Sequence, residues 1–229
     1  MNTHLEPSEV LLYQSHHPIS LAEAAIASFD TKTPRSAQMA QQLPAWFLKF
    51  QRQVDQKGEH TTELTTQLMR EGWALVSKTF FLDSVSDVPV SWDSNLLSRS
   101  GSRGETSGVG QAVMVKLYPY KTARMLLNTM AHEAAHAFIS MYSCHNEVCG
   151  DAACVKEKGV SMGVKGHGLA WNMLAMAIER ASEVFLDFRL DLGRASSSRD
   201  EHELLDRDHA VEALFGGVDP RRDIPHPNH

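Results

Sequence analysis

The stretch "NTMAHEAAHAFISMY", residues 128–142, places His132 and His136 four positions apart, with Glu133 between them. Residues four apart lie on one face of a helix, so both imidazoles can reach the same metal ion. Glu133 follows His132 directly and is therefore rotated away from the histidine pair. From there its carboxylate can contact a metal-bound water without occupying a coordination position of the metal. The H-E-x-x-H pattern therefore predicts a helix with zinc ligands His132 and His136 and a general base, Glu133. The alternative is a helix whose two histidines are satisfied by hydrogen bonds.

A catalytic zinc ion normally takes three protein ligands and leaves one position for water. The segment "GHGLAW", residues 166–171, offers His167 as the third ligand, on the same helical stripe as the apolar Trp171. That stripe must face the core, and the glycines on either side of His167 let the backbone approach closely. His167 is the preferred third ligand.

Two other ways of completing the site use different residues. The long metzincin pattern requires glycine and histidine at positions where this chain has Ile139 and Tyr142, which excludes that class. A thermolysin-type site would use a helix glutamate, and Glu179 or Glu183 stays open for that role.

The rest of the chain alternates between helical and strand-like patterns. Capping signals at Ser20 and at Thr33-Pro34 predict two early helices, and Pro44 is expected to break or kink the second. A third helix is predicted over 61–82. Two strands are predicted at 88–92 and 111–118, joined by a long mobile loop through "SRSGSRGETSGVG" (98–110). Two further helices are predicted at 122–142 and 167–188.

Composition places the chain among ordinary globular proteins. It has 229 residues, 42% of them hydrophobic and 22% charged, which suffices for a substantial core. The first ten residues lack the basic-then-apolar order of a secretory signal, and no apolar stretch approaches the roughly 20 residues of a membrane helix. We therefore expect an intracellular protein with no membrane partner.

The charged and sulfur-containing residues suggest two further sites. The formal net charge is −6, with the acidic excess mostly in the tail after residue 195. In the middle of the chain, one span contains five basic residues and a single acidic one, Glu105. This span is either a binding patch for a polyanion or an ordinary solvated face. Its basic residues are Arg99, Arg103, Lys116, Lys121 and Arg124. The cysteines Cys144, Cys149 and Cys154 could bind a second metal with His145, although free thiols are the preferred interpretation.

The motif residues resemble the SprT-like (Spartan-type) zinc metallopeptidase domain family. "TMAHEAAHA" (129–137) and "GHGLAW" (166–171) match its zinc pattern, and "VSWDSNLLSRSG" (90–101) and "AVMVKLYPY" (112–120) are similar to its strands. The similarity spans about residues 63–190. Ala134 stands where many members have methionine, the cysteine-bearing loop before His167 is long, and no zinc ribbon follows the domain.

The resemblance implies an α+β, zincin-like (short gluzincin-like) fold with an H-E-x-x-H helix, a small sheet and extra N-terminal helices. It implies Zn²⁺ at His132, His136 and His167, with Glu133 as the catalytic base. It also implies proteolysis of DNA-associated or DNA-crosslinked proteins, and hence a nuclear location; without the DNA role we expect a cytoplasmic one. A non-catalytic zinc-binding or DNA-associated scaffold is the alternative function.

The same resemblance divides the chain into three parts. Residues 1–60 are expected to form an N-terminal helical extension and residues 61–194 the metallopeptidase domain. Residues 195–229 are expected to form an acidic, largely flexible tail that contains one solvated helix.

Overall fold

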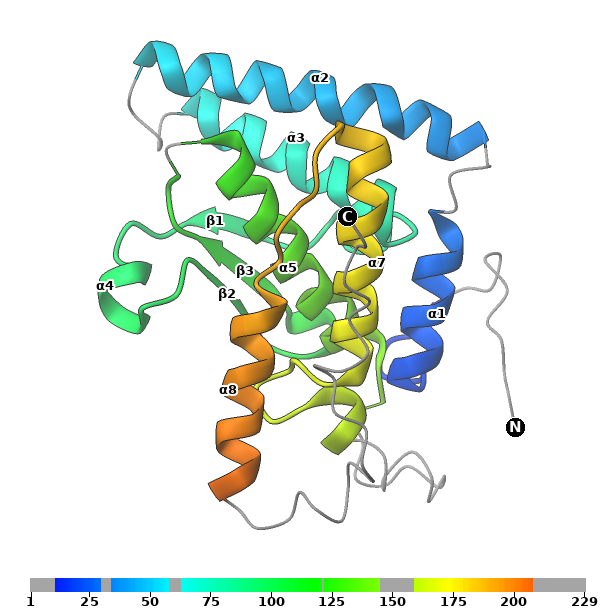
Figure 1. Ribbon diagram of the computed structural model, residues 1–229. Coiled ribbons are helices and arrows are strands. Elements are labelled where there is room, and N and C mark those ends of the chain that lie inside the picture. Colours follow the sequence, from blue (N-terminus) through cyan, green and yellow to red (C-terminus); the bar gives the residue numbers. More distant parts are fainter. Residues whose placement is uncertain (1–10, 30–33, 58–62, 121, 145–158, 208–229) are drawn as a thin grey trace, which may run out of the picture.

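The computed structural model describes residues 11–29, 34–57, 63–120, 122–144 and 159–207 (Figure 1). Helices pack against a small three-stranded sheet with strand order β1-β3-β2, which confirms the predicted α+β class. None of the described helices combines the length and the apolar composition that crossing a bilayer requires.

Helix α1 (Pro18–Ser28) begins earlier than the capping signal at Ser20 predicted. Its N-cap is His17, whose ring Nδ1 accepts a hydrogen bond from the backbone N–H of Ile19 at 3.3 Å. A proline at the first helical position has no N–H to satisfy, so His17-Pro18 is a sufficient start.

Helix α2 (Pro34–Lys57) continues through Pro44, so the predicted break there is wrong. The helix stays continuous because its apolar face packs along α3 (Glu63–Phe80). Figure 1 shows α2 and α3 side by side. Trp46 is buried in this contact, and its indole N–H donates to the carbonyl of Leu68 at 2.7 Å. Tertiary packing thus compensates for the backbone hydrogen bond that Pro44 cannot make.

The predicted mobile loop between the two strands is largely ordered, which corrects that expectation. Strand β1 (Val90–Trp92) pairs in parallel with β3 (Met114–Leu117). Between them the glycine- and serine-rich segment forms helix α4 (Leu96–Ser100), strand β2 (Gly104–Ser107) and the 3-10 turn η1 (Gly110–Ala112). Strand β2 pairs antiparallel with β3 and forms one edge of the sheet.

Two long helices form the centre of the molecule. Helix α5 (Ala123–Tyr142) packs against β2 and β3 on one side and against α7 (Leu169–Leu186) on the other (Figure 1). Helix α8 (Arg194–Arg207) follows and contacts α7. Both segments predicted as late helices are therefore present. The core is continuous from Leu21 in α1 to Leu192 after α7, so the described part of residues 1–60 shares the core of the segment that follows.

Gly72 in α3 tests the packing of α2 on α3. A Cβ at this position would lie 2.2 Å from the Trp46 ring, which is rigid and buried. We expect Gly72→Ala to lower the free energy of unfolding by about 1–3 kcal/mol, as overpacking does. In the matched control Gly159→Ala the added Cβ meets nothing within 4 Å. Urea unfolding should show the control unchanged or slightly stabilised; equal effects of the two changes would contradict this packing.

Candidate metal centre

Helix α5 presents the H-E-x-x-H residues from a rigid position. Thr122 caps the helix, its hydroxyl oxygen accepting from the N–H of Met125 at 3.2 Å. The face that carries Ala131, Ala134 and Ala135 is fully buried, which fixes the rotation of the helix. The two histidines are therefore held by the core rather than by a surface loop.

His167 reaches the same place from the turn that precedes α7. Gly166 has a φ of +82°, and a Cβ there would lie 3.1 Å from Nδ1 of His136. Gly168 donates its N–H to the carbonyl of Met162 at 2.9 Å, and its Cα lies against the backbone of Gly163. The two glycines thus allow the turn to fold back tightly and bring His167 against α5.

The Nε2 atoms of the three histidines converge on one point. The distances are 3.1 Å between His132 and His136, 3.0 Å between His136 and His167, and 3.3 Å between His132 and His167. Tetrahedral coordination with metal–nitrogen bonds of 2.0–2.1 Å would separate two ligand nitrogens by about 3.3 Å. The three histidines are therefore close enough to bind one metal ion.

Hydrogen bonding among the histidines does not account for this triangle. His132 Nδ1 lies 2.8 Å from the carbonyl oxygen of Leu192, so Nδ1 must carry the proton of a neutral ring. Its Nε2 then presents a lone pair toward the other two Nε2 atoms. One Nε2–H can point to one neighbour only, so the three contacts cannot all be hydrogen bonds. A cation at the centre satisfies all three lone pairs.

The imidazoles of His136 and His167 are in the protonation state that a metal requires. Burial lowers the pKa of His136 well below 6.5, and the neighbouring His132 and His167 lower it further. Burial also lowers the pKa of His167 to about 4, with smaller contributions from His132 and Lys165. Both rings are therefore neutral at pH 7 and can act as ligands without losing a proton.

Glu133 lies beside the triangle without joining it. Its carboxylate is 3.9 Å from Nε2 of His132, at Oε1, while Oε2 accepts a hydrogen bond from the hydroxyl of Thr106 at 2.7 Å. Burial raises the pKa of Glu133, and this effect is partly offset by His132 and by the Thr106 hydrogen bond. A Cβ on Gly104 would lie 2.4 Å from the same Oε1, so strand β2 can lie this close to Glu133 only because residue 104 is glycine. The arrangement leaves a confined carboxylate with one oxygen directed toward the histidines.

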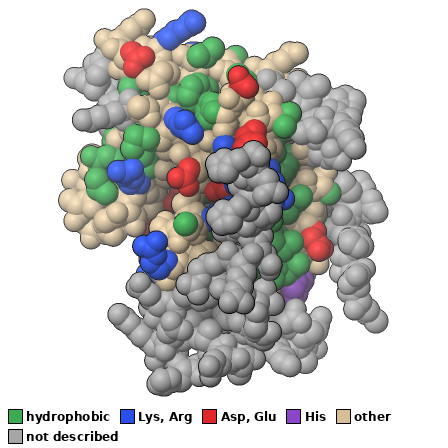
Figure 2. All heavy atoms as spheres, in the orientation of Figure 1, with side chains coloured by type: hydrophobic (Ala, Val, Ile, Leu, Met, Phe, Trp, Pro, Cys, Tyr) green, Lys and Arg blue, Asp and Glu red, His purple; other side chains and the backbone are tan. Residues whose placement is uncertain are grey.

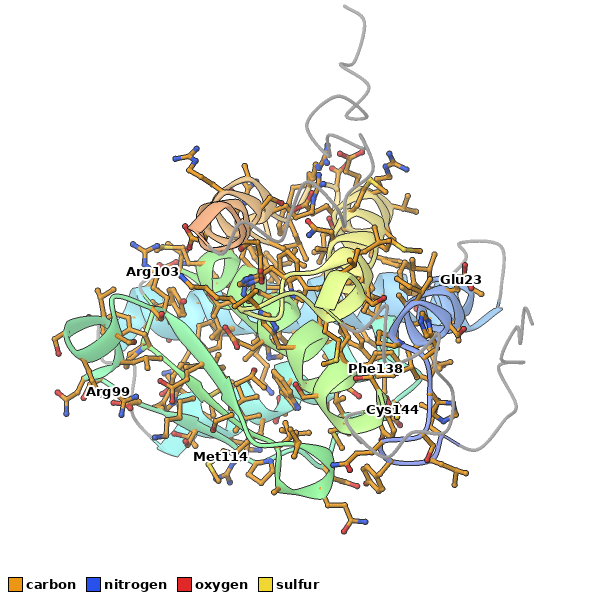
Figure 3. The ribbon with its side chains drawn as sticks, turned by 90° about the horizontal axis from the view of Figure 1, so that it is seen from below. Glu23, Arg99, Arg103, Met114, Phe138 and Cys144 are labelled. Atoms are coloured by element: carbon orange, nitrogen blue, oxygen red, sulfur yellow. The ribbon has the colours of Figure 1, made fainter. Side chains whose placement is uncertain are left out.

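A cleft of about 440 Å³ opens onto the site. His132, Glu133 and His167 line it, together with Tyr120, Arg103 and Asp191. Tyr120 donates its hydroxyl hydrogen to the carbonyl of Arg103 at 3.1 Å, and burial raises its pKa to about 12, so it stays protonated. Figure 3 shows Arg103 and Arg99 on the side of the molecule that carries α4 and β2. Two of the three histidines, His132 and His167, thus border this cleft, whereas His136 lies behind them.

The two glutamates considered as thermolysin-type ligands lie elsewhere. Glu179 is buried, and its carboxylate accepts from Arg189 at 3.2 Å, from Arg194 at 2.9 Å and from the N–H of Leu192 at 3.1 Å. Glu183 is exposed and ion-pairs with Arg189 at 4.0 Å. Among the described residues, the ligand cluster consists of the three histidines.

The basic span is partly neutralised by acidic neighbours. Arg99 pairs with Glu105 at 3.0 Å and also with Asp93 at 3.4 Å, a partner that the sequence did not indicate. Lys116 stands opposite Glu105 in the β2–β3 pairing. Arg124 lies over the ring of Phe188 and donates to the carbonyl of Arg189 at 3.0 Å, and Lys121 lies outside the described residues. Figure 2 shows Lys and Arg interspersed with Asp and Glu on the visible face.

The proposed second metal site falls mostly outside the described part of the chain. Cys144 is a free, partly buried cysteine at the end of α5 (Figure 3). Cys149, Cys154 and His145 lie beyond the described residues, so that hypothesis stays a prediction.

Several groups around the triangle were missed by sequence reasoning. The Trp171 ring packs under all three imidazoles, with centroid distances of 4.8 Å to His132, 5.5 Å to His136 and 4.6 Å to His167. Trp171 had been recognised only as an apolar core residue. Thr106 and the Leu192 carbonyl had no local pattern that pointed to the site. Glu179 was considered only as a possible metal ligand, whereas its carboxylate binds Arg189, Arg194 and the N–H of Leu192.

No protein-family model, curated protein or solved structure matches this chain.

Metal content is the first property that this geometry predicts. We expect the purified chain to bind one divalent transition-metal ion through the triangle, and each of His132→Ala, His136→Ala and His167→Ala to lower the stoichiometry at micromolar free metal. His17→Ala, which removes the cap of α1, should retain full binding. Elemental analysis after dialysis measures this; three single variants that all retain wild-type content would contradict the shared site.

The lowered pKa of His167 predicts a pH dependence of the metal-free protein. The native state keeps this ring neutral, so the unfolded chain takes up the proton first as the pH falls. The stability is fully present above pH 6.5 and is lost down to the native pKa of about 4, by about 3 kcal/mol from this residue. Urea unfolding in chelator at pH 7.5, 6.0 and 4.5 should show a shallower loss for His167→Gln. An unchanged dependence in that variant would contradict the assignment.

Proposed function

We propose that this chain is a zinc-dependent endopeptidase with a short zincin-like fold, related to the SprT-like metallopeptidases. The single observation that carries the proposal is the juxtaposition of three converging Nε2 atoms with a fourth, acidic group that does not join them. The Glu133 carboxylate is buried, lies 3.9 Å from His132 Nε2 and borders an open cleft. A purely structural metal site would need no such carboxylate.

The donor set supports zinc as the ion. Three imidazoles with one open side match the protein ligands of catalytic zinc, and the intermediate softness of imidazole nitrogen suits zinc better than magnesium or calcium. When bound, zinc would supply a Lewis acid that polarises a carbonyl and lowers the pKa of water. His132, His136 and His167 would hold it.

Glu133 would act as the general base and then as the general acid. Its Oε1 lies 3.9 Å from Nε2 of His132, while Thr106 donates to Oε2 and so fixes the orientation of the carboxylate. Burial raises the pKa of Glu133, which makes the carboxylate a better proton acceptor than an exposed glutamate. It would take a proton from the attacking water and deliver it to the leaving amine.

The cleft is suited to an extended peptide. Strand β2 is one of the two edge strands of the described sheet, and its first residue, Gly104, lines the cleft next to Glu133. An edge strand offers backbone N–H and C=O groups to which a substrate segment can add as a further strand. This supports protein as the substrate class.

Association with DNA stays a prediction from the resemblance and the basic span, and a nuclear location stays a prediction from the resemblance. The pairing of Arg99 with Glu105 and Asp93 leaves less positive charge near the cleft than the sequence suggested. The non-catalytic scaffold remains the competing function, and it differs from the peptidase only in what Glu133 does.

Glu133→Gln is the experiment that tests the peptidase. The amide keeps the size of the side chain but cannot accept the proton, so we expect hydrolysis of an unfolded protein substrate to fall by at least about a hundredfold. Zinc content should stay at one ion per chain, because Glu133 is not a ligand. The matched control is Glu183→Gln, a change of the same kind at an exposed position of α7.

Wild-type protein loaded with zinc that cleaves no unfolded protein or peptide would support the scaffold instead. A Glu133→Gln variant as active as the Glu183→Gln control would rule out Glu133 as the base, whatever the ion.

A further inference from the structure

Helix α8 carries a buried carboxylate that is directed at the turn before α7. Glu201 is 5% exposed, although it lies in a helix that is otherwise rich in charged and serine residues. Burying a carboxylate is costly unless it is hydrogen-bonded. Its position in the sequence places it in the segment expected to form the flexible acidic tail.

The Glu201 carboxylate caps three backbone N–H groups of the turn. Oε2 accepts from Val164 at 2.8 Å, and Oε1 accepts from Lys165 at 2.8 Å and from His167 at 2.9 Å. Charge-assisted hydrogen bonds of this kind are roughly twice as strong as neutral ones. The backbone of the third histidine is therefore held by a residue that follows it by 34 positions.

A glycine makes this approach feasible. Gly163 has a φ of +77°, and a Cβ there would lie 2.7 Å from Oε1 of Glu201 and 2.5 Å from the N–H of Gly168. Any larger residue would push the carboxylate away from the turn. The Glu201 side chain of α8 can thus contact the backbone of the turn directly, because residue 163 has no side chain.

The ring of His167 has one nitrogen that the triangle does not use. Nδ1 of His167 is buried and has no hydrogen-bond partner, and it lies 3.9 Å from Oε1 of Glu201. If Nε2 gives its lone pair to a metal ion, the proton of the neutral ring must be on Nδ1. That N–H then needs an acceptor, and a shift of about 1 Å would bring it to the carboxylate at normal hydrogen-bond length.

We propose that Glu201 is a positioning residue for the third metal ligand. It holds the Gly163–Gly168 turn through three backbone N–H groups and accepts the Nδ1–H of His167 when Nε2 binds the ion. His132 is oriented in the corresponding way by the Leu192 carbonyl, 2.8 Å from its Nδ1. Both outer partners follow α7 in sequence, so residues 192–201 complete the metal centre. The inference rests on the metal-binding part of the proposed function and not on peptide hydrolysis.

Zinc affinity measured by competition with a chromophoric chelator tests the role of Glu201. We expect Glu201→Gln to weaken zinc binding by about 10- to 100-fold, the usual effect of losing an outer-sphere partner of a ligand histidine. The matched control is Asp200→Asn, the same loss of charge at the neighbouring, exposed position of α8, which should change the dissociation constant less than about twofold.

A double-mutant cycle separates action through His167 from a general effect on the fold. In the His167→Ala background, Glu201→Gln should change the zinc dissociation constant less than about twofold, because the ligand through which it acts is already absent. The full 10- to 100-fold effect in that background would overturn the proposal. So would an affinity of Glu201→Gln equal to that of the wild type.

A conservative variant keeps the test decisive if Glu201→Gln does not fold. Glu201→Asp retains the charge but shortens the reach of the carboxylate, so we expect zinc binding weaker than in the wild type and tighter than in His167→Ala. Wild-type affinity in Glu201→Asp would contradict the proposal. None of these measurements uses peptide hydrolysis, so a zinc-loaded protein that cleaves nothing would refute the peptidase and leave this inference standing.

Discussion

The convergence of three imidazole nitrogens within 3.3 Å of one another is the constraint on which the site depends. Three lone pairs directed at one point repel each other unless a cation lies between them. The arrangement can persist only because α5 and α7 are held rigidly by the core, with Trp171 packed beneath all three rings. Packing of the protein core thus contributes to holding the three imidazoles in this arrangement.

The groups that orient the ligands come from late in the chain. Glu179 in α7 binds Arg189, Arg194 and the N–H of Leu192, and the Leu192 carbonyl lies against Nδ1 of His132. One buried carboxylate therefore fixes the loop that orients the first ligand. Glu201 is related to His167 in a similar way, through the backbone of the turn. Both acids are buried, and their hydrogen bonds to backbone and side-chain donors compensate for that burial.

The sequence predicted that these three histidines would come together, because each prediction depends on local rules. The four-residue spacing of His132 and His136 is a property of any helix, and the glycines around His167 indicated a close backbone approach. The α+β class was implied by the resemblance to the SprT-like domain, and the change in hydrophobic period along the chain agrees with it. The spacing of the two helix histidines and the glycines around the third are local features, which is why they could be recognised in the sequence.

What the sequence did not reveal depends on contacts between distant segments. Strand β2 was hidden in a glycine- and serine-rich stretch, and it forms because β3 provides a partner. Thr106, the Leu192 carbonyl and Glu201 meet their partners 27, 60 and 34 positions away, without any periodic signal. Pro44 did not break α2, since packing on α3 outweighs one missing hydrogen bond.

X-ray absorption at the zinc edge of the zinc-loaded protein tests the central claim most directly. The account predicts a first shell with three imidazole nitrogens at about 2.0–2.1 Å, the outer-ring scattering typical of histidine, and one further light atom. A first shell dominated by sulfur at about 2.3 Å, or one with fewer than three imidazoles, would contradict it.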